Sequence, residues 1–294
     1  MVEIAHRSHY PGPGVIFMAD NSKPLFVEDV PINGHCSGEQ WTLLDFDRLA
    51  YLIAVIALGQ AQHVAVVLSG LDPGSPVLGL AELKAQANTV LTVKGTDPWQ
   101  RDGFIFEAIS WIAAQQTAGR GDFMRDPHVK STTQGLDGLL IHVADGAIAR
   151  STIFEDKCSG DPKKIFAGQV MKSFRDYHLA KRSSELLAAA GELLRQADLP
   201  KAAVPKAAAA ILDLKKRRYR ASLAVTPDVD SEVARASVFT GYEKLAGLTA
   251  DQRLGAVFQI PTDKLRPWFD ALATAARAHV DAQTETTMAE PTNV

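Results

Sequence analysis

The sequence has little cysteine, no long apolar run and no apolar leader. Cys36 and Cys158 are the only cysteines, and neither lies in a Cys-x-x-Cys pair, which argues against a disulfide framework and against a structural zinc site. The longest apolar run, residues 49–58, is about half as long as a membrane-spanning helix requires. Because the first residues, MVEIAHRSHYPGPG, contain no apolar signal core, we expect a cytoplasmic protein.

Common nucleotide-binding and zinc-hydrolase motifs are also missing. No Gly-x-x-x-x-Gly-Lys-Ser/Thr motif occurs, so ATP is not bound through a P-loop and any ATP-driven step belongs to a partner. The eight histidines include no His-Glu-x-x-His pair, which argues against a zinc hydrolase. The 294 residues are 46% hydrophobic and 22% charged, which excludes a collagen-like, coiled-coil or wholly disordered chain.

Basic residues are concentrated in one part of the chain. The net charge is only −3, yet residues 161–220 carry 14 Lys and Arg against 6 Asp and Glu. Such a local surplus can follow a phosphate backbone, and the alternative is a set of solvated helix faces and ends. The candidate nucleic-acid-binding residues are Lys163, Lys164, Lys172, Arg175, Lys181, Arg182, Lys215, Lys216, Arg217, Arg218 and Arg220.

Hydrophobic spacing and turn residues predict an α/β protein. The predicted strands cover residues 14–18, 25–30, 63–69, 89–93, 136–143, 148–157, 221–226 and 256–261. The predicted helices cover residues 43–58, 80–88, 97–116, most of 165–194, a segment restarting near Lys206, and 263–280. We expect four regions: an N-terminal α/β region (1–95), a core (96–200), a C-terminal α/β extension packed on the core (201–280) and a disordered tail (281–294).

A pair of carboxylates and a lysine provide the strongest chemical signal. Asp137 and the triplet Glu155-Asp156-Lys157 are separated by 17 residues, enough for one hairpin around Asp145-Gly146. Carboxylates on neighbouring strands can hold Mg²⁺ or Mn²⁺ through oxygen, and the carbonyl of Asp156 can supply a third ligand. Lys157 lies on the same face as Glu155, where it can assist an attacking water or neutralise developing charge in phosphodiester hydrolysis.

The register of the hairpin tests this site. With a simple two-residue loop, Asp137 would face Phe154, and Glu155 would point to the other side of the sheet. A longer loop or one bulge brings Asp137 opposite Glu155, and we predict one of these. The same register places one apolar set on a single face: Leu139, Ile141, Val143, Ala149 and Ile153.

The Glu-x-Lys spacing alone has little specificity. A second copy, Glu82-Leu83-Lys84 with Asp72 upstream, lies in a helical pattern after a Pro/Gly loop. Only the triplet at 155–157 lies in a strand–turn–strand, which is the context that the chemistry requires.

This arrangement resembles the PD-(D/E)xK nuclease superfamily over residues 97–182. Asp137 matches the Asp of the motif, although Leu136 replaces its Pro, and Glu155 and Lys157 match its Glu-x-Lys. The pattern Gly103-Phe-Ile-Phe-Glu107 matches the Glu-bearing helix of many members, and Gln169 matches a Gln on the following helix. The surface-residue alternative remains open for Glu107 and Gln169.

The resemblance implies a restriction-endonuclease-like core, with a mixed sheet flanked by helices, and a Mg²⁺- or Mn²⁺-dependent DNA nuclease. Asp137, Glu155, Lys157, Glu107 and Gln169 are the implied catalytic residues. The layout also resembles the nuclease subunit of the Hachiman anti-phage defence system, which implies a helicase or ATPase partner.

Two other functions remain as alternatives. One is a nuclease-fold subunit that binds nucleic acid or assembles with a partner without catalysis. The weaker one is a thiol hydrolase at Cys36, which lies in a Gly-x-Cys-x-Gly pattern but follows a segment broken by Pro31. The sequence leaves open DNA against RNA, internal against terminal cutting, and whether the chain forms a homo-oligomer.

Overall fold

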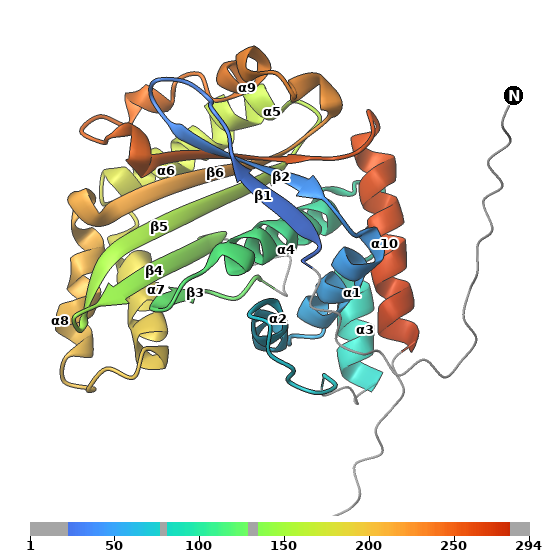
Figure 1. The fold of residues 1–294 in the computed structure, drawn as a ribbon, viewed down its shortest axis with the longest axis horizontal. Helices are drawn as coiled ribbons and strands as arrows, with labels where there is room; N and C mark the ends of the chain where they lie inside the picture. The colour runs from blue at the N-terminus through green and yellow to red at the C-terminus, as the bar shows by residue number, and fades with distance from the viewer. Residues whose placement is uncertain (1–22, 77–80, 129–134, 283–294) are drawn as a thin grey trace, which may run out of the picture.

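The computed structural model describes residues 23–76, 81–128 and 135–282. The predicted strand at 14–18 and most of the predicted tail lie outside these residues. Seven strands form one mixed sheet in the order β1-β2-β7-β6-β5-β4-β3 (Figure 1). The strands are β1 (Leu25–Asp29), β2 (Ser37–Leu43), β3 (Asp122–Met124), β4 (Gly138–Ala144), β5 (Ala147–Cys158), β6 (Arg217–Val225) and β7 (Arg253–Gln259).

The centre of the sheet is parallel and both edges are antiparallel. Strands β2, β7, β6 and β5 run parallel, whereas β1 pairs antiparallel with β2, and β4 with both β5 and β3. The α/β prediction is therefore confirmed. This single sheet draws strands from the three predicted regions 1–95, 96–200 and 201–280.

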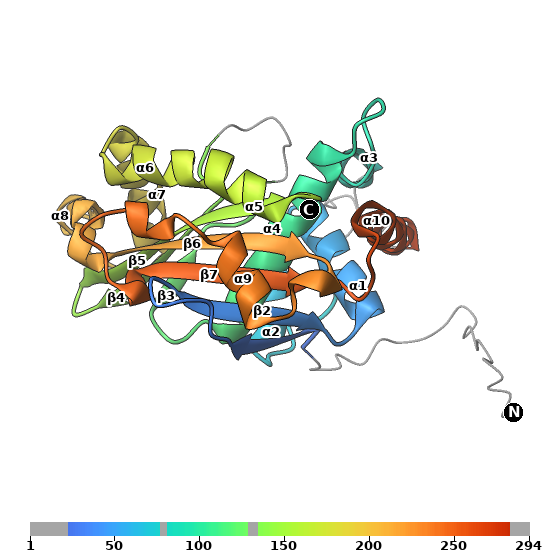
Figure 2. The ribbon, with the colours of Figure 1, turned by 90° about the horizontal axis from the view of Figure 1, so that it is seen from above.

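Helices cover both faces of the sheet. The first face packs against α1 (Phe46–Ala57), α2 (Ala61–Leu68), α3 (Ala81–Val90), α4 (Trp99–Thr117) and α10 (Leu265–Ala282). The second packs against α5 (Pro162–Ile165), α6 (Met171–His178), α7 (Ser183–Gln196), α8 (Val204–Ala209) and α9 (Glu232–Val238), and α5, α6 and α7 lie along one side of the sheet in Figure 2. A π-helical turn, η1 (Phe166–Val170), joins α5 to α6, and 3₁₀ turns occur at Ala210–Leu212, Leu214–Lys216, Pro227–Val229, Tyr242–Lys244 and Ala250–Gln252.

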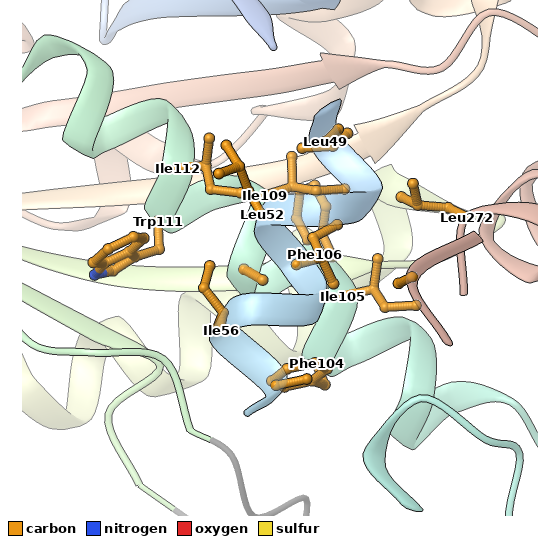
Figure 3. Packing of buried hydrophobic residues seen from close by; sticks show 14 of the residues in the cluster. Leu49, Leu52, Ile56, Phe104, Ile105, Phe106, Ile109, Trp111, Ile112 and Leu272 are labelled. Atoms are coloured by element: carbon orange, nitrogen blue, oxygen red, sulfur yellow. The ribbon is translucent and has the colours of Figure 1, made fainter. Parts of the chain in front are cut away.

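Helix α4 is the central helix of the first face. It is buried on nearly every side, because the sheet, α1 and α10 all pack against it. Figure 3 shows its apolar side chains among those of α1 and α10: Phe104, Ile105, Phe106, Ile109, Trp111 and Ile112 against Leu49, Leu52, Ile56 and Leu272. This packing fixes α4 against β5, which positions the polar residues that α4 carries.

Two predicted strands do not form, and helices α2 and α3 take up most of the first and the start of the second. Residues 63–69 lie mostly in α2, where Val64 and Val67, three positions apart, share a buried face. Residues 89–93 include the end of α3, where the Thr89 hydroxyl donates to the Ala85 carbonyl at 2.7 Å. The β-branched side chains favour strands locally, but burial against the neighbouring helices decides the outcome.

The β4–β5 hairpin contains the predicted bulge. Asp145 (φ 52°) and Gly146 (φ 71°) form a two-residue turn with both residues in the left-handed region. The register then shifts, so that Gly138 pairs with Phe154, and Asp137, one residue earlier, comes opposite Glu155.

One detail of that prediction is wrong. The alternation of apolar residues predicts Ala149 on the apolar face, but it is the extra residue of the bulge and is exposed, because Val143 pairs with Ile148 and His142 with Arg150. Ile148 is buried in its place.

A candidate active site at the end of strand β5

Three charged side chains meet where β5 ends. Asp137 lies just before β4. Glu155 and Lys157 alternate with Asp156 along β5, so the side chains of Glu155 and Lys157 point to the second face of the sheet. The Lys157 Nζ lies 2.5 Å from Asp137 Oδ2 and 3.1 Å from Glu155 Oε2. The structure therefore brings together the three residues that the sequence motif selected.

The peptide of Asp156 completes this cluster. Its N–H donates to Asp137 Oδ2 at 3.0 Å, and its carbonyl accepts from Lys157 Nζ at 3.2 Å. Two carboxylate oxygens and one carbonyl oxygen thus surround a single ammonium group.

Glu155 is a buried carboxyl in a charged environment. Only 4% of the residue is exposed, and the Ser173 hydroxyl of α6 donates to its Oε1. Burial raises the pKa of Glu155 to about 7; the charge of Asp137 adds to the rise, and Lys157 and Ser173 oppose it. Burial lowers the pKa of Lys157, but Asp137 and Glu155 outweigh it and raise that pKa above its usual value, so Lys157 stays charged.

The donor set fits a hard divalent cation only if Lys157 moves. Among residues 23–76, 81–128 and 135–282, no group of three or more His, Cys, Asp or Glu side chains is arranged to hold a metal. Asp137, Glu155 and the Asp156 carbonyl nevertheless supply three oxygens directed at one cation, and Mg²⁺ prefers oxygen ligands completed by water. The Lys157 ammonium occupies the point where these oxygens converge.

The side chain of Asp156 does not belong to this cluster. It points to the first face of the sheet, where Ser110 Oγ of α4 donates to its Oδ1 at 2.8 Å. The prediction of Asp156 as a metal ligand therefore holds at most for its carbonyl, because neighbouring residues in a strand point to opposite faces. Burial raises the pKa of this carboxyl to about 7; Arg220 opposes the rise and Asp137 adds to it.

Glu107 is paired with a histidine that the sequence motifs do not include. Its Oε1 accepts from the His128 backbone N–H at 2.8 Å, and the His128 Nδ1 lies 2.9 Å from the same oxygen. Burial raises the pKa of Glu107; the His128 contacts oppose the rise, and the charge of Asp137 adds to it. Glu107 is therefore within electrostatic reach of Asp137, but its hydrogen bonds go to His128.

Gln169 lies on the helical segment after the triplet, as the resemblance implies, and its role there stays a prediction. It lies in the π-helical turn η1 with an exposed side chain. Ser173, about one turn further along the same helical segment, makes the contact with Glu155. A serine has no distinctive spacing, so the sequence carries no signal for it.

Arg182 contacts the serine that holds the Glu155 carboxyl. Its Nη1 donates to Ser173 Oγ at 3.3 Å, and its guanidinium lies 4.2 Å from the centre of the Tyr177 ring. Glu185 fixes the guanidinium through two hydrogen bonds of 2.8 and 2.9 Å. Arg182 is thus pre-positioned beside the partner of Glu155.

The other basic residues of the segment 161–182 are exposed or pair with other side chains. Lys164, Lys172 and Arg175 are exposed. Lys181 pairs with Asp176 at 2.9 Å, and the Lys163 Nζ donates to the Ser237 hydroxyl at 2.9 Å.

The basic run at 215–220 does not form one nucleic-acid-binding surface. Arg217 is buried and donates to the carbonyls of Tyr177 and Ile211, both at 2.9 Å. Arg220 is buried on the first face of the sheet. The prediction for these two arginines is wrong, because alternation along β6 places both guanidinium groups inside the protein.

The remaining residues of that run are not beside the carboxylates either. Arg217 pairs with Ser151 and Ala221 with Glu155, which separates the start of β6 from Glu155 by about 13 Å at 3.3 Å per residue. Lys216 donates to the Ile148 carbonyl at 3.0 Å, Lys215 is exposed, and Arg218 is half-buried.

Cys36 is not an activated nucleophile. It is buried in the short turn before β2, where its N–H donates to Asn33 Oδ1 at 3.2 Å. Burial raises the pKa of its thiol to about 12, which leaves little thiolate at neutral pH. This geometry is not the strand–turn–helix of a nucleophile elbow.

No known protein-family model matches this chain, and no curated protein matches it. Likewise, no helix within the described ranges is long and apolar enough to cross a membrane. What supports a function is therefore the geometry of the cluster at the end of β5.

Proposed function

We propose that this protein is a metal-dependent nuclease of the PD-(D/E)xK type that hydrolyses phosphodiester bonds of DNA. The observation that carries the proposal is the convergence of Asp137, Glu155, Lys157 and the Asp156 carbonyl at the end of one hairpin. The element order supports it, since a helix (α4), the hairpin β4–β5 and a second helical segment (α5–α6) follow one another as in a restriction-endonuclease-like core.

Each residue of the cluster has a defined task in this mechanism. Asp137 and Glu155 would hold Mg²⁺ or Mn²⁺, and that cation would supply Lewis acidity toward the phosphate and the attacking water. Lys157, moved out of the carboxylate pair, keeps its positive charge and stabilises the charge that develops on the phosphate. Ser173 fixes the orientation of the Glu155 carboxyl through its hydrogen bond.

Basic residues on α6 and just before α7 provide the contact with the DNA backbone. Lys172 and Arg175 flank Ser173 on α6 and are exposed, and Arg182 reaches the Ser173 hydroxyl. Phosphate contacts of this kind give affinity without reading sequence. A helicase or ATPase partner would supply any ATP-driven step.

Cleavage of supercoiled plasmid with Mg²⁺, Mn²⁺ or EDTA tests the proposal. We expect metal-dependent nicking by the wild type, its loss in Lys157→Ala, and its retention in the matched control Lys215→Ala, which removes an exposed lysine just before the start of β6. Equal cleavage by wild type and Lys157→Ala would contradict the assigned site.

One observation favours the second candidate, a binding or assembly subunit. Lys157 pairs with both carboxylates and occupies the cation position, as it would in a site that holds no metal. This candidate predicts that the protein binds DNA and does not cleave it with any of the metal ions tested. Lys157→Ala and Lys215→Ala would then give the same result in the cleavage assay.

A further inference from the structure

A second polar cluster lies directly beneath the site, on the first face of the sheet. Asp156, Ser110 of α4 and Arg220 of β6 are all buried, with 7%, 0% and 4% of each residue exposed. The Arg220 Nη2 donates to Ser110 Oγ at 2.5 Å, and Ser110 Oγ donates to Asp156 Oδ1 at 2.8 Å. The hydroxyl of Ser110 thus bridges a guanidinium and a carboxylate that solvent and substrate do not reach.

The cluster is connected to the site through a single peptide group. The Asp156 N–H donates to Asp137 Oδ2, and the Asp156 carbonyl faces the Lys157 ammonium. Any rotation of that peptide would move one group away from Asp137 and the other away from the cation position. Its side chain is the only part of Asp156 that extends to the opposite face.

Stability alone gives a poor account of this arrangement. Burying a guanidinium is costly, and an apolar cluster of similar volume is often as stable as a buried ion pair. Within the described part of the chain, the buried Arg220 Nε has no hydrogen-bond partner, although the guanidinium lies 3.7 Å from the centre of the Phe154 ring.

We propose that Ser110, Asp156 and Arg220 form a positioning unit that holds the Asp156 peptide in the orientation required by Asp137 and by the bound cation. None of their side chains touches substrate; they act through the peptide of Asp156. Ser110 lies three residues after Glu107 on α4, so the same contact holds this helix against β5. The inference rests on the proposed nuclease function.

Two serines of the core give a matched test. Ser110→Ala removes the bridging hydroxyl, whereas Ser151→Ala makes the same change at a fully buried serine of β5 whose hydroxyl has no partner among the described residues. For Ser110→Ala we expect kcat to fall about tenfold to a hundredfold with KM for DNA unchanged, because misplacement of reacting groups affects the chemical step. Mn²⁺ affinity, measured by calorimetry, should fall in the same variant, and Ser151→Ala should match the wild type in all three quantities.

A conservative pair at Asp156 separates positioning from a structural role. Asp156→Asn keeps an oxygen that accepts from Ser110, and Asp156→Leu, of similar size, does not. We expect Asn to retain several-fold more of kcat than Leu, with kcat measured under conditions where circular dichroism shows both variants to be folded.

The outcomes distinguish this inference from the proposed function. Metal-dependent cleavage by wild type, with Ser110→Ala equal to Ser151→Ala in kcat and Mn²⁺ affinity, would overturn the positioning unit and leave the nuclease intact. A wild type that neither binds Mn²⁺ nor cleaves DNA would overturn both. A fall in kcat at unchanged KM in Ser110→Ala and Asp156→Leu, absent from Ser151→Ala and smaller in Asp156→Asn, supports the unit.

Discussion

The two faces of β5 use neighbouring carboxyl groups for different purposes. Glu155 points to the second face and meets Lys157 and Asp137, whose side chains are 23% and 25% exposed. Asp156 points to the first face and meets Ser110 and Arg220, both buried. Burial raises the pKa of both carboxyls to about 7, so neither burial nor acidity distinguishes them.

Access is what separates the two faces. A cation or a phosphate can approach Lys157 and Asp137 from solvent, whereas α4 covers the side chain of Asp156. A strand alternates its side chains, so one short segment can offer reactive groups on one face and the support for their backbone on the other. Adjacent acidic residues in such a strand are therefore poor evidence for a shared metal site.

The largest expected effect is on DNA cleavage, and it tests directly whether the two faces of β5 have separate roles. Glu155→Gln removes a proposed metal ligand without changing size, and we expect cleavage to fall at least about a thousandfold, the scale of losing a principal electrostatic group. Asp156→Asn should cost about tenfold in the same plasmid assay, because its peptide remains in place. Equal losses in the two variants would show that the faces do not have separate roles.

The next effect concerns stability on the covered face. Arg220→Met leaves the Asp156 carboxyl without its opposing charge, and we expect the free energy of unfolding to fall by about 3–5 kcal/mol. Arg182→Met, on the open face, should change it by less than about 1 kcal/mol, since partly exposed ion pairs contribute little. Denaturant titration of both variants measures the difference, and similar losses would contradict the assignment of Arg220 to a sealed cluster.

Local signals make the hairpin predictable from the sequence. Asp145-Gly146 favours a turn of two left-handed residues, and the alternation of apolar residues demands a register in which Asp137 faces Glu155. That register is compatible only with a longer loop or with a bulge in one strand, so the amino-acid pattern predicts one of these two, and the structure has the tight turn and the bulge. The grouping of Asp137, Glu155 and Lys157 follows from the same short segment.

Contacts between distant segments are not predictable in this way. Ser173 and Ser110 reach the β5 carboxyls from helices 18 and 46 residues away along the chain, and a serine has no characteristic pattern. The charge of Arg217 and Arg220 is visible in the sequence, but their burial depends on strand pairing with β5 and β7. Val64 and Val67 likewise favour a strand until the neighbouring helices bury them in α2.

A smaller effect concerns metal affinity on the open face, the second face of the sheet, where Lys157 lies. The Lys157 ammonium occupies the position where the oxygens of Asp137, Glu155 and the Asp156 peptide converge. Lys157→Met removes this competing cation, so we expect Mn²⁺ to bind about tenfold more tightly although cleavage is lost, about 1.4 kcal/mol in binding free energy. Calorimetry of wild type, Lys157→Met and the control Lys215→Met tests this, and weaker binding by Lys157→Met would show that the lysine supports the metal instead.

The last effect is a dependence of stability on pH, which Glu155 and Asp156 share until metal is added. A carboxyl whose pKa is near 4.5 when unfolded and about 7 when folded binds its proton more tightly in the folded state between these values. Its contribution to stability therefore falls as pH rises through that window and stays constant above it. The melting temperature of Glu155→Gln should rise relative to wild type from about pH 4.5 to about pH 7, and Asp156→Asn should show the same trend.

Mn²⁺ favours the ionised form of Glu155 alone, so saturating metal should remove the trend for Glu155→Gln and leave it for Asp156→Asn. Loss of both trends would mean that the cation reaches the carboxyl of Asp156, and the separation of the two faces would be wrong.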